Sequence, residues 1–343
     1  MHSSSEVKAR KMVVRRALTL LVAAVLVFVA AACSADSDSD SGGGGGDGFS
    51  YTDARGEKIE LDATPTKIAM NSSAAAALMP YGIKPVAIWA SGEPEELAAL
   101  EGLDLSGVEV LGTTYGKVDV DKLSTLEPEL VITSWHPGEY LGGLGKVDDE
   151  VSKDIAKLAP IMTVSAQEPA SASLDDWRKV AEQLGADVND GTIADQKAAY
   201  DTAVADLKKA TAAHPGVSAY AVSPSSQFFV AVPDLFAELR DYTAWGLDVR
   251  KSDVAQDESS GAFSPVSWED AGDYTSDILL YDGRPNQAPP LETVVKEHPT
   301  VATLDTVKDD HVVEWVTDAT LNYATYTKQI KELTAAIEKL PAA

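Results

Sequence analysis

The sequence predicts an α/β protein of two Rossmann-like lobes joined by one long α-helix, with a ligand cleft between the lobes. Two observations support this fold class. Short apolar strand signals alternate with helical signals along most of the chain, which is typical of α/β layers. Residues 192–213 contain no glycine or proline and carry apolar residues at helical spacing. This pattern indicates a helix of about 20 residues, near 30 Å long.

The first lobe is expected over residues 49–191. Its strand signals are short apolar runs, at residues 67–70, 85–89, 108–111, 130–134 and 161–164. Helical signals lie between them, at residues 74–81, 120–126 and 174–184. The first of these helices should end at Gly82 and the last at Gly185, because glycine readily adopts the left-handed conformation that closes a helix.

The second lobe is expected over residues 214–343, after His214, Pro215 and Gly216 end the long helix. Its strand signals lie at residues 217–222, 228–232, 278–281 and 311–316. Helices are expected at residues 233–245, with proline in the first turn, and at residues 321–340. Ligands favour domain interfaces and the carboxyl ends of strands, so the cleft between the lobes is the expected binding site.

Residues 1–32 are expected to be a secretory signal of the lipoprotein type. A basic head precedes the apolar run 17–32, which is too short for a comfortable membrane span of roughly 20 residues. Three alanines lead into Cys33, the only cysteine, and resemble a bacterial lipobox in which Cys33 is lipidated. Ala30 stands where that pattern prefers leucine, so simple release from the membrane stays open, as does a buried free thiol.

Residues 33–48 are rich in serine, aspartate and glycine and predict a flexible tether. The chain carries a formal net charge of −26, which repels nucleic acid and anionic lipid head groups. The sequence has no nucleophile-elbow, zinc-protease or dinucleotide-binding motif, which argues against an enzyme. Its five histidines are scattered, which argues against a receptor for a bare metal ion, and no metal site is expected.

Five segments, in order, resemble type III periplasmic binding proteins of ABC importers. They are TPTKIA with YGIKPV (64–69 and 81–86), VDVDKLSTLEPELVI (118–132), LAP (158–160), SWED with DILL (267–270 and 277–280) and HP with LDTVK (298–299 and 304–308). The chain departs from the family pattern at Lys67, Asp121 and Glu129, where the family prefers Arg, Glu and Asp. It also lacks a tryptophan near Thr303.

The resemblance implies a monomeric extracytoplasmic lipoprotein, anchored to the outer face of the cell membrane, that binds without catalysis or a cofactor. Its expected ligand is an Fe(III)–siderophore, which it would deliver to the permease of an ABC importer. A haem or cobalamin receptor of the same family is the alternative, and His136 would then be a candidate axial ligand for haem. An adhesion or sensing lipoprotein is a further class. The residues alone do not distinguish a hydroxamate from a catecholate ligand.

The resemblance also assigns two carboxylates to permease docking. By position, Asp121 and Glu269 would pair with arginines of the permease, because a carboxylate and a guanidinium form charge-assisted, often bidentate, hydrogen bonds. The alternative is that both are solvated acids at helix starts, where the helix dipole favours negative charge.

The expected cleft wall combines donors with aromatic rings, because a ferric siderophore has both apolar and oxygen-rich surface. Asn71, Ser72 and Ser73 follow the first expected strand and are candidate hydrogen-bond donors. Tyr115 stands where hydroxamate-binding relatives place a ligand-contacting arginine. The other candidates follow strands or lie in loops: Trp89, Trp135, His136, Phe263, Tyr281, Arg284 and Trp315. For Trp89 and Trp315 the alternative is core packing, and for Arg284 it is a solvated position in a turn.

Overall fold

The computed structural model of the chain describes residues 48–256, 261–285 and 287–341. The expected signal at 1–32, Cys33 and all of the expected tether except Gly48 lie outside the described residues. The described residues belong to one unit, Gly46–Ala343. Within them, no helix is both long enough and apolar enough to cross a membrane.

The first sheet has seven strands, of which five are parallel in the order β5-β4-β3-β6-β9. Strands β7 and β8 extend the carboxyl end of β6 as an antiparallel hairpin. The strands are β3 Ile68–Asn71, β4 Ala87–Trp89, β5 Glu109–Gly112, β6 Leu130–His136, β7 Tyr140–Leu141, β8 Gly145–Lys146 and β9 Ile161–Ser165. A separate hairpin pairs β1 Phe49–Thr52 with β2 Lys58–Leu61. Strand β3 is buried along its whole length, as expected for a parallel strand covered on both faces.

The helices of this half are α1 Ser72–Leu78, α2 Val120–Thr125, α3 Glu150–Leu158 and α4 Ala170–Gln183. Asn71 caps α1 by accepting a hydrogen bond from the backbone of Ala74 at 2.9 Å, so the first turn of α1 begins directly at the end of β3. The 3-10 turn Met79–Tyr81 extends α1, and Gly82 closes it with a φ of 83°. This is the left-handed closure that the sequence predicts.

The second sheet has six strands in the order β13-β11-β10-β14-β15, with β12 also pairing with β10. Strands β10, β14 and β15 are parallel, whereas β11 and β13 are antiparallel to their neighbours. The strands are β10 Ser218–Pro224, β11 Phe228–Ala231, β12 Asp248–Val249, β13 Phe263–Val266, β14 Ile278–Asp282 and β15 Val312–Trp315. The helices are α6 Ala237–Ala244, α7 Leu291–Glu297, α8 Asp305–Lys308 and α9 Tyr323–Glu338.

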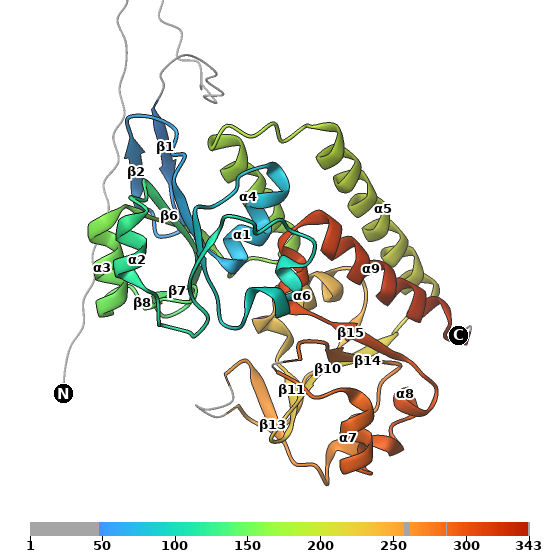
Figure 1. Ribbon diagram of the computed structural model, residues 1–343. Helices are drawn as coiled ribbons and strands as arrows, with labels where there is room; N and C mark the ends of the chain where they lie inside the picture. Colours follow the sequence, from blue (N-terminus) through green and yellow to red (C-terminus); the bar gives the residue numbers. More distant parts are fainter. Residues whose placement is uncertain (1–47, 257–260, 286, 342–343) are drawn as a thin grey trace, which may run out of the picture. The chain divides into compact units, whose positions relative to one another are not determined.

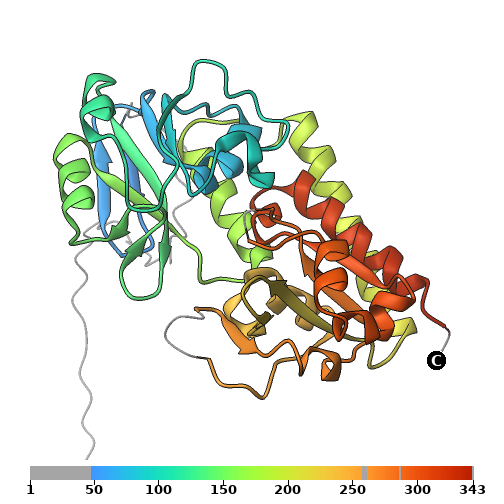
Figure 2. The ribbon, with the colours of Figure 1, turned by 60° about the horizontal axis from the view of Figure 1, so that its bottom comes forward.

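Helix α5, Gly191–Ala213, connects the half with the first sheet to the half with the second. It packs along α9 (Figure 1), and Figure 2 shows the same pair from a second direction. The ring of Tyr200 on α5 lies 5.4 Å from that of Tyr323 and 5.7 Å from that of Tyr326, between ring centroids. The predicted fold, two α/β lobes joined by a long helix, is confirmed.

The structure differs from the sequence prediction at residues 233–245. Instead of one helix, Pro233–Leu235 forms a 3-10 turn, Phe236 is extended, and α6 begins at Ala237. The Phe236 ring packs edge-on against Trp315 and Phe263, with ring centroids 5.0 and 5.1 Å apart, and this packing accompanies the break. The sequence also did not predict the β1–β2 hairpin, β7, β8, β12, β13, α3, α7 or α8.

A buried carboxylate joins the two halves. Asp241 on α6 accepts hydrogen bonds from the backbone N–H of Ser171 at 2.8 Å, from the Ser171 hydroxyl at 2.7 Å and from the Tyr326 hydroxyl at 2.9 Å. Ser171 lies in the first turn of α4, so Asp241 satisfies a free N–H at that helix terminus and complements its dipole. Asn322 makes a second link by donating to the backbone carbonyl of Ala76 in α1 at 3.3 Å.

Asp241→Ala is expected to lower the free energy of unfolding by about 3 kcal/mol, because it leaves three donors, two on Ser171 and one on Tyr326, without their charged acceptor. Urea unfolding followed by circular dichroism would measure the loss. Asp175→Ala removes an exposed acid of α4 and should change stability by less than about 0.5 kcal/mol. Equal effects of the two substitutions would contradict the role given to Asp241.

Candidate functional site

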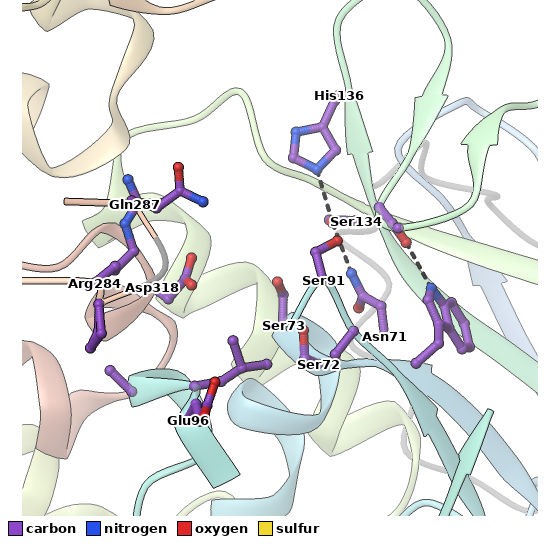
Figure 3. Close-up of a pocket in the computed structure, with 17 residues that line it drawn as sticks. Asn71, Ser72, Ser73, Ser91, Glu96, Ser134, His136, Arg284, Gln287 and Asp318 are labelled. Atoms are coloured by element: carbon purple, nitrogen blue, oxygen red, sulfur yellow. Dashed lines mark hydrogen bonds between the residues drawn. The ribbon is translucent and has the colours of Figure 1, made fainter. Parts of the chain in front are cut away.

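A cavity of about 240 Å³ lies where the carboxyl ends of strands from both sheets meet (Figure 3). The first sheet supplies residues that follow β3, β4 and β6, and the second supplies residues that follow β14 and β15. The lining consists of Asn71, Ser72, Ser73, Trp89, Ala90, Ser91, Glu96, Leu97, Ala98, Ser134, His136, Gly142, Gly143, Arg284, Pro285, Gln287 and Asp318. Strand ends of this kind are where open α/β sheets bind ligands.

A second cavity, of about 260 Å³, adjoins the first and shares Ser73, Ser134, His136 and Asp318 with it. Its wall is more apolar and comes mainly from α4, from residues 235–238 at the start of α6 and from the 3-10 turn Thr317–Leu321. The residues that it adds include Ser165, Ser173, Trp177, Leu235, Phe236, Glu238 and Thr320. We refer to the two cavities together as the cleft. Its size suits a small-molecule ligand, since such pockets measure roughly 300–1,000 Å³.

A chain of hydrogen bonds holds the polar side chains of the first wall. The Ser134 hydroxyl lies 3.0 Å from His136 Nε2 and accepts a hydrogen bond from Asn71 Nδ2 at 3.2 Å, as the dashed lines in Figure 3 mark. Asn71 is fixed at its other end because its Oδ1 caps α1. His136 is exposed at the mouth, yet its partial enclosure by the walls lowers the pKa of the imidazole below the ordinary value. The ring is therefore neutral at pH 7.

Two glycines let the β7–β8 hairpin lie directly against this wall. A Cβ at Gly142 would lie 2.2 Å from Ser134 Oγ and 2.5 Å from Asn71 Nδ2, so only glycine fits there without displacement. The carbonyl of Gly142 accepts hydrogen bonds from Trp89 Nε1 at 3.0 Å and from the Thr133 hydroxyl at 2.9 Å. Gly143 has a φ of 74°, a conformation that favours glycine.

The second wall is organised around Arg284. Its guanidinium donates two hydrogen bonds to Asp282, from Nε to Oδ1 at 2.9 Å and from Nη2 to Oδ2 at 2.7 Å. Asp282 is buried at the end of β14 and also accepts a hydrogen bond from the Ser223 hydroxyl at 2.6 Å. The positive charge that Arg284 brings to the cleft is thus already paired with a carboxylate.

Glu238 and Asp318 bring further carboxylates to this wall. Glu238 is 2% exposed and accepts a hydrogen bond from Trp315 Nε1 at 2.7 Å. Burial raises the pKa of Glu238 to about 7, because removal from water disfavours the charged form. Burial likewise raises the pKa of the Asp318 carboxyl, and the nearby Arg284 guanidinium offsets only part of that effect.

The structure brings six of the eleven candidate cleft residues into the lining of the first cavity. These are Asn71, Ser72, Ser73, Trp89, His136 and Arg284, and Figure 3 shows Arg284 on the opposite side from Asn71 and His136. Trp89 lies at the base of the wall, where it is almost fully buried. That these residues bind a ligand remains a proposal.

The other five candidates lie away from the cleft lining. Trp135 packs against the apolar cluster of the first sheet. Side chains alternate along β6, and because Ser134 and His136 face the cleft, Trp135 faces the other way. Tyr115 is 52% exposed and lines a separate open hollow. Phe263 lies on the edge strand β13 and packs against Phe236. Tyr281 and Trp315 are buried, the first donating to the carbonyl of Pro289 and the second to Glu238.

Both expected docking acids are exposed on the surface. Asp121 lies in the first turn of α2, but Asp119 is the residue that caps this helix, by accepting from the backbone of Lys122 at 2.8 Å. Glu269 lies in the turn after β13, where Asp270 makes the hydrogen bonds to Ser267 that hold the turn. Neither Asp121 nor Glu269 makes a side-chain hydrogen bond or ion pair in the described part of the chain.

Sequence reasoning missed several residues of the cleft lining. Asp318 lies three residues after the end of β15. The expectation that side chains just after strands line the site would therefore have predicted it. Glu96 and Ser91 lie in the loop after β4 and carry the same signal. No sequence pattern indicated Glu238, because it lies on α6 and only the tertiary structure brings that part of α6 to the cleft. Among the described residues, no group of three or more His, Cys, Asp or Glu side chains is arranged to hold a metal ion.

Comparison with known proteins gives two kinds of match. A family model described as "Periplasmic binding protein" matches residues 82–319. Among solved structures, the chain resembles DesE, a ferric-siderophore receptor protein from Streptomyces coelicolor, with 29% sequence identity and a TM-score of 0.75. That match covers 86% of this chain and 99% of DesE. No curated protein matches the chain.

More distant structures share the fold. The petrobactin-binding protein YclQ from Bacillus subtilis matches with 18% identity and a TM-score of 0.62, covering 85% of this chain and 99% of YclQ. FhuD2 from Staphylococcus aureus, solved with bound ferrioxamine B, matches with 17% identity and a TM-score of 0.56, covering 80% of this chain and 98% of FhuD2.

Glu238→Gln is expected to change how stability depends on pH. The pKa of Glu238 is about 7 in the folded protein, against an ordinary value of 4.5, so the stability that its bound proton contributes is complete below pH 4.5 and is lost as pH rises through 7. Gln keeps an acceptor for Trp315 but does not titrate. Relative to wild type, the variant should therefore gain ~2 kcal/mol between pH 5 and pH 8.

Urea unfolding of both proteins at the two pH values would measure this gain. Glu168→Gln, at an exposed position, is the control and should show no such pH dependence. A constant difference between wild type and Glu238→Gln across this range would mean that Glu238 does not titrate there.

Proposed function

The chain belongs to the periplasmic binding protein family, and from that premise we propose that it captures a ferric siderophore and delivers it to the permease of an ABC importer. The observation that carries the proposal is the cleft itself: strand ends of both sheets converge on two adjoining cavities whose polar wall is held by hydrogen bonds. The likeness to DesE supports the ligand class. In this proposal residues 49–191 and 214–343 are the two lobes, and residues 192–213 are the connecting helix.

The proposed activity is binding without chemistry. The first wall presents hydroxyl, amide and imidazole groups that can contact the oxygen-rich surface of an iron chelate, and the half-buried Phe236 of the second cavity supplies aromatic surface. The haem alternative has less support, because Nε2 of His136 is already engaged by Ser134. No cofactor is required for this activity.

Delivery would depend on the exposed acids Asp121 and Glu269. Both are free of the hydrogen bonds that hold their neighbours in place, so a permease arginine can approach either without disrupting the fold. The family is extracytoplasmic. We propose that Cys33 is lipidated after removal of residues 1–32, that residues 33–48 then link the lipid to the folded part, and that the protein works as a monomer.

The wild-type protein is expected to show saturable quenching of tryptophan fluorescence by ferric siderophores, because Trp89 and Trp177 line the cleft. Ser72→Trp should raise the dissociation constant at least tenfold by filling the cavity. Ser124→Trp, on the exposed face of α2, should leave it unchanged. Calorimetric titration would check both variants. Absence of binding by every ferric siderophore would refute the proposed ligand class.

Glu269→Arg and Asp121→Arg are expected to abolish uptake of the ferric siderophore by cells while leaving the dissociation constant of the isolated protein unchanged. The reason is that a reversed charge would repel the permease arginines. Glu292→Arg, which reverses an exposed charge on α7, is the matched control and should support normal uptake. Normal uptake by both docking variants would remove these residues from the docking surface.

A further inference from the structure

Acidic side chains outnumber basic ones in the described lining of the cleft. Glu96, Glu238 and Asp318 bring three carboxylates to the described walls, and Arg284 brings the single guanidinium. That guanidinium is already paired with Asp282, and the lowered pKa of His136 leaves its ring neutral. Within the described residues, the cleft therefore offers an anionic ligand no positive charge that is not already paired.

The two carboxylates of the second cavity retain unused acceptor capacity. A carboxylate can accept about four hydrogen bonds. In the described part of the chain, Glu238 accepts one from a side chain, at Oε1, although the residue is 2% exposed and lines the cavity. Asp318 accepts one, from the Thr317 hydroxyl at 3.4 Å. A buried carboxylate with so few partners is costly unless a cation or donor joins it.

The rest of the second cavity suits an alkyl chain. Trp177, Leu235 and Phe236 line this cavity together with Glu238 and the shared polar residues, and they make part of its wall apolar. Leu235 is 55% exposed at the edge of this cavity, so a ligand arm that enters the cavity would cover it. An arm that is apolar along its length and positively charged at its end would match this surface.

We propose that the cleft selects ferric siderophores whose iron chelate carries no negative charge and which bear a pendant alkylammonium arm, with the arm in the cavity of Glu238 and Asp318. This inference rests on the proposed siderophore function. Three hydroxamates neutralise Fe(III), whereas three catecholates give a complex of net charge −3, which these carboxylates would repel. An ammonium beside Glu238 would also favour the ionised carboxylate, whose pKa burial has raised.

The test compares three iron-loaded ligands on the purified protein. Ferrioxamine B is a trihydroxamate complex with an alkylammonium arm, its N-acetyl derivative lacks the charge, and a ferric tricatecholate is a trianion. Ferrioxamine B is expected to bind about tenfold more tightly than its N-acetyl derivative, equivalent to ~1.4 kcal/mol. The tricatecholate should bind more weakly than either.

Variants assign the preference to the two carboxylates. Asp318→Asn and Glu238→Gln should reduce the preference for ferrioxamine B over its N-acetyl derivative to about twofold or less. Asp234→Asn removes an equal charge from the same segment but outside the cleft lining, and should leave the preference intact. The ligand comparison on the wild-type protein needs no variant. The inference can therefore still be refuted if a variant folds poorly.

The outcomes separate this inference from the proposed function. Equal affinity of the wild type for ferrioxamine B and its N-acetyl derivative, or tighter binding of the tricatecholate, would overturn charge selection while leaving siderophore capture in place. The same holds if neither substitution alters the preference. Failure of all three complexes, and of every other ferric siderophore, to bind would overturn both.

Discussion

The cleft depends on a buried carboxylate that holds the two halves of the molecule together. Asp241 reaches from α6 to the first turn of α4 and to Tyr326 on α9, so opening the halves would separate a buried charge from its donors. Ala170 and Leu174 of α4 pack into the same apolar cluster as the strands of the second sheet, which reinforces the link. A largely preformed cleft follows, and preorganisation of this kind lowers the entropic cost of binding.

The two walls of the cleft are stiff for different reasons. On the first wall, Asn71 both caps α1 and donates to Ser134, so the polar groups are fixed by the helix that begins at the end of β3. Gly142 permits the hairpin to close over this network without steric conflict. On the second wall, Arg284 is held by the bidentate contact with Asp282. A ligand would therefore meet surfaces whose side chains are already oriented.

The negative charge of the chain has different consequences inside and outside the cleft. Outside, most acids are solvated, and exposed acids such as Glu269 remain available to a basic partner. Inside, the carboxylate of Glu238 has lost most of its water, so its interaction with a ligand charge would be far less screened. For this reason a few carboxylates in the cleft bear more on the choice of ligand than the net charge of the whole chain.

The sequence by itself determined the α/β class, the long helix, most of the central strands and the family, because these depend on local periodicity and on short motifs in order. It also identified Asn71, Ser72, His136 and Arg284, since side chains that directly follow parallel strands collect at one edge of a sheet. Only the tertiary structure decided that Trp135 and Trp315 face the core and that Glu238 faces the cleft. The face that such a side chain presents depends on partners distant in the chain, which no local pattern encodes.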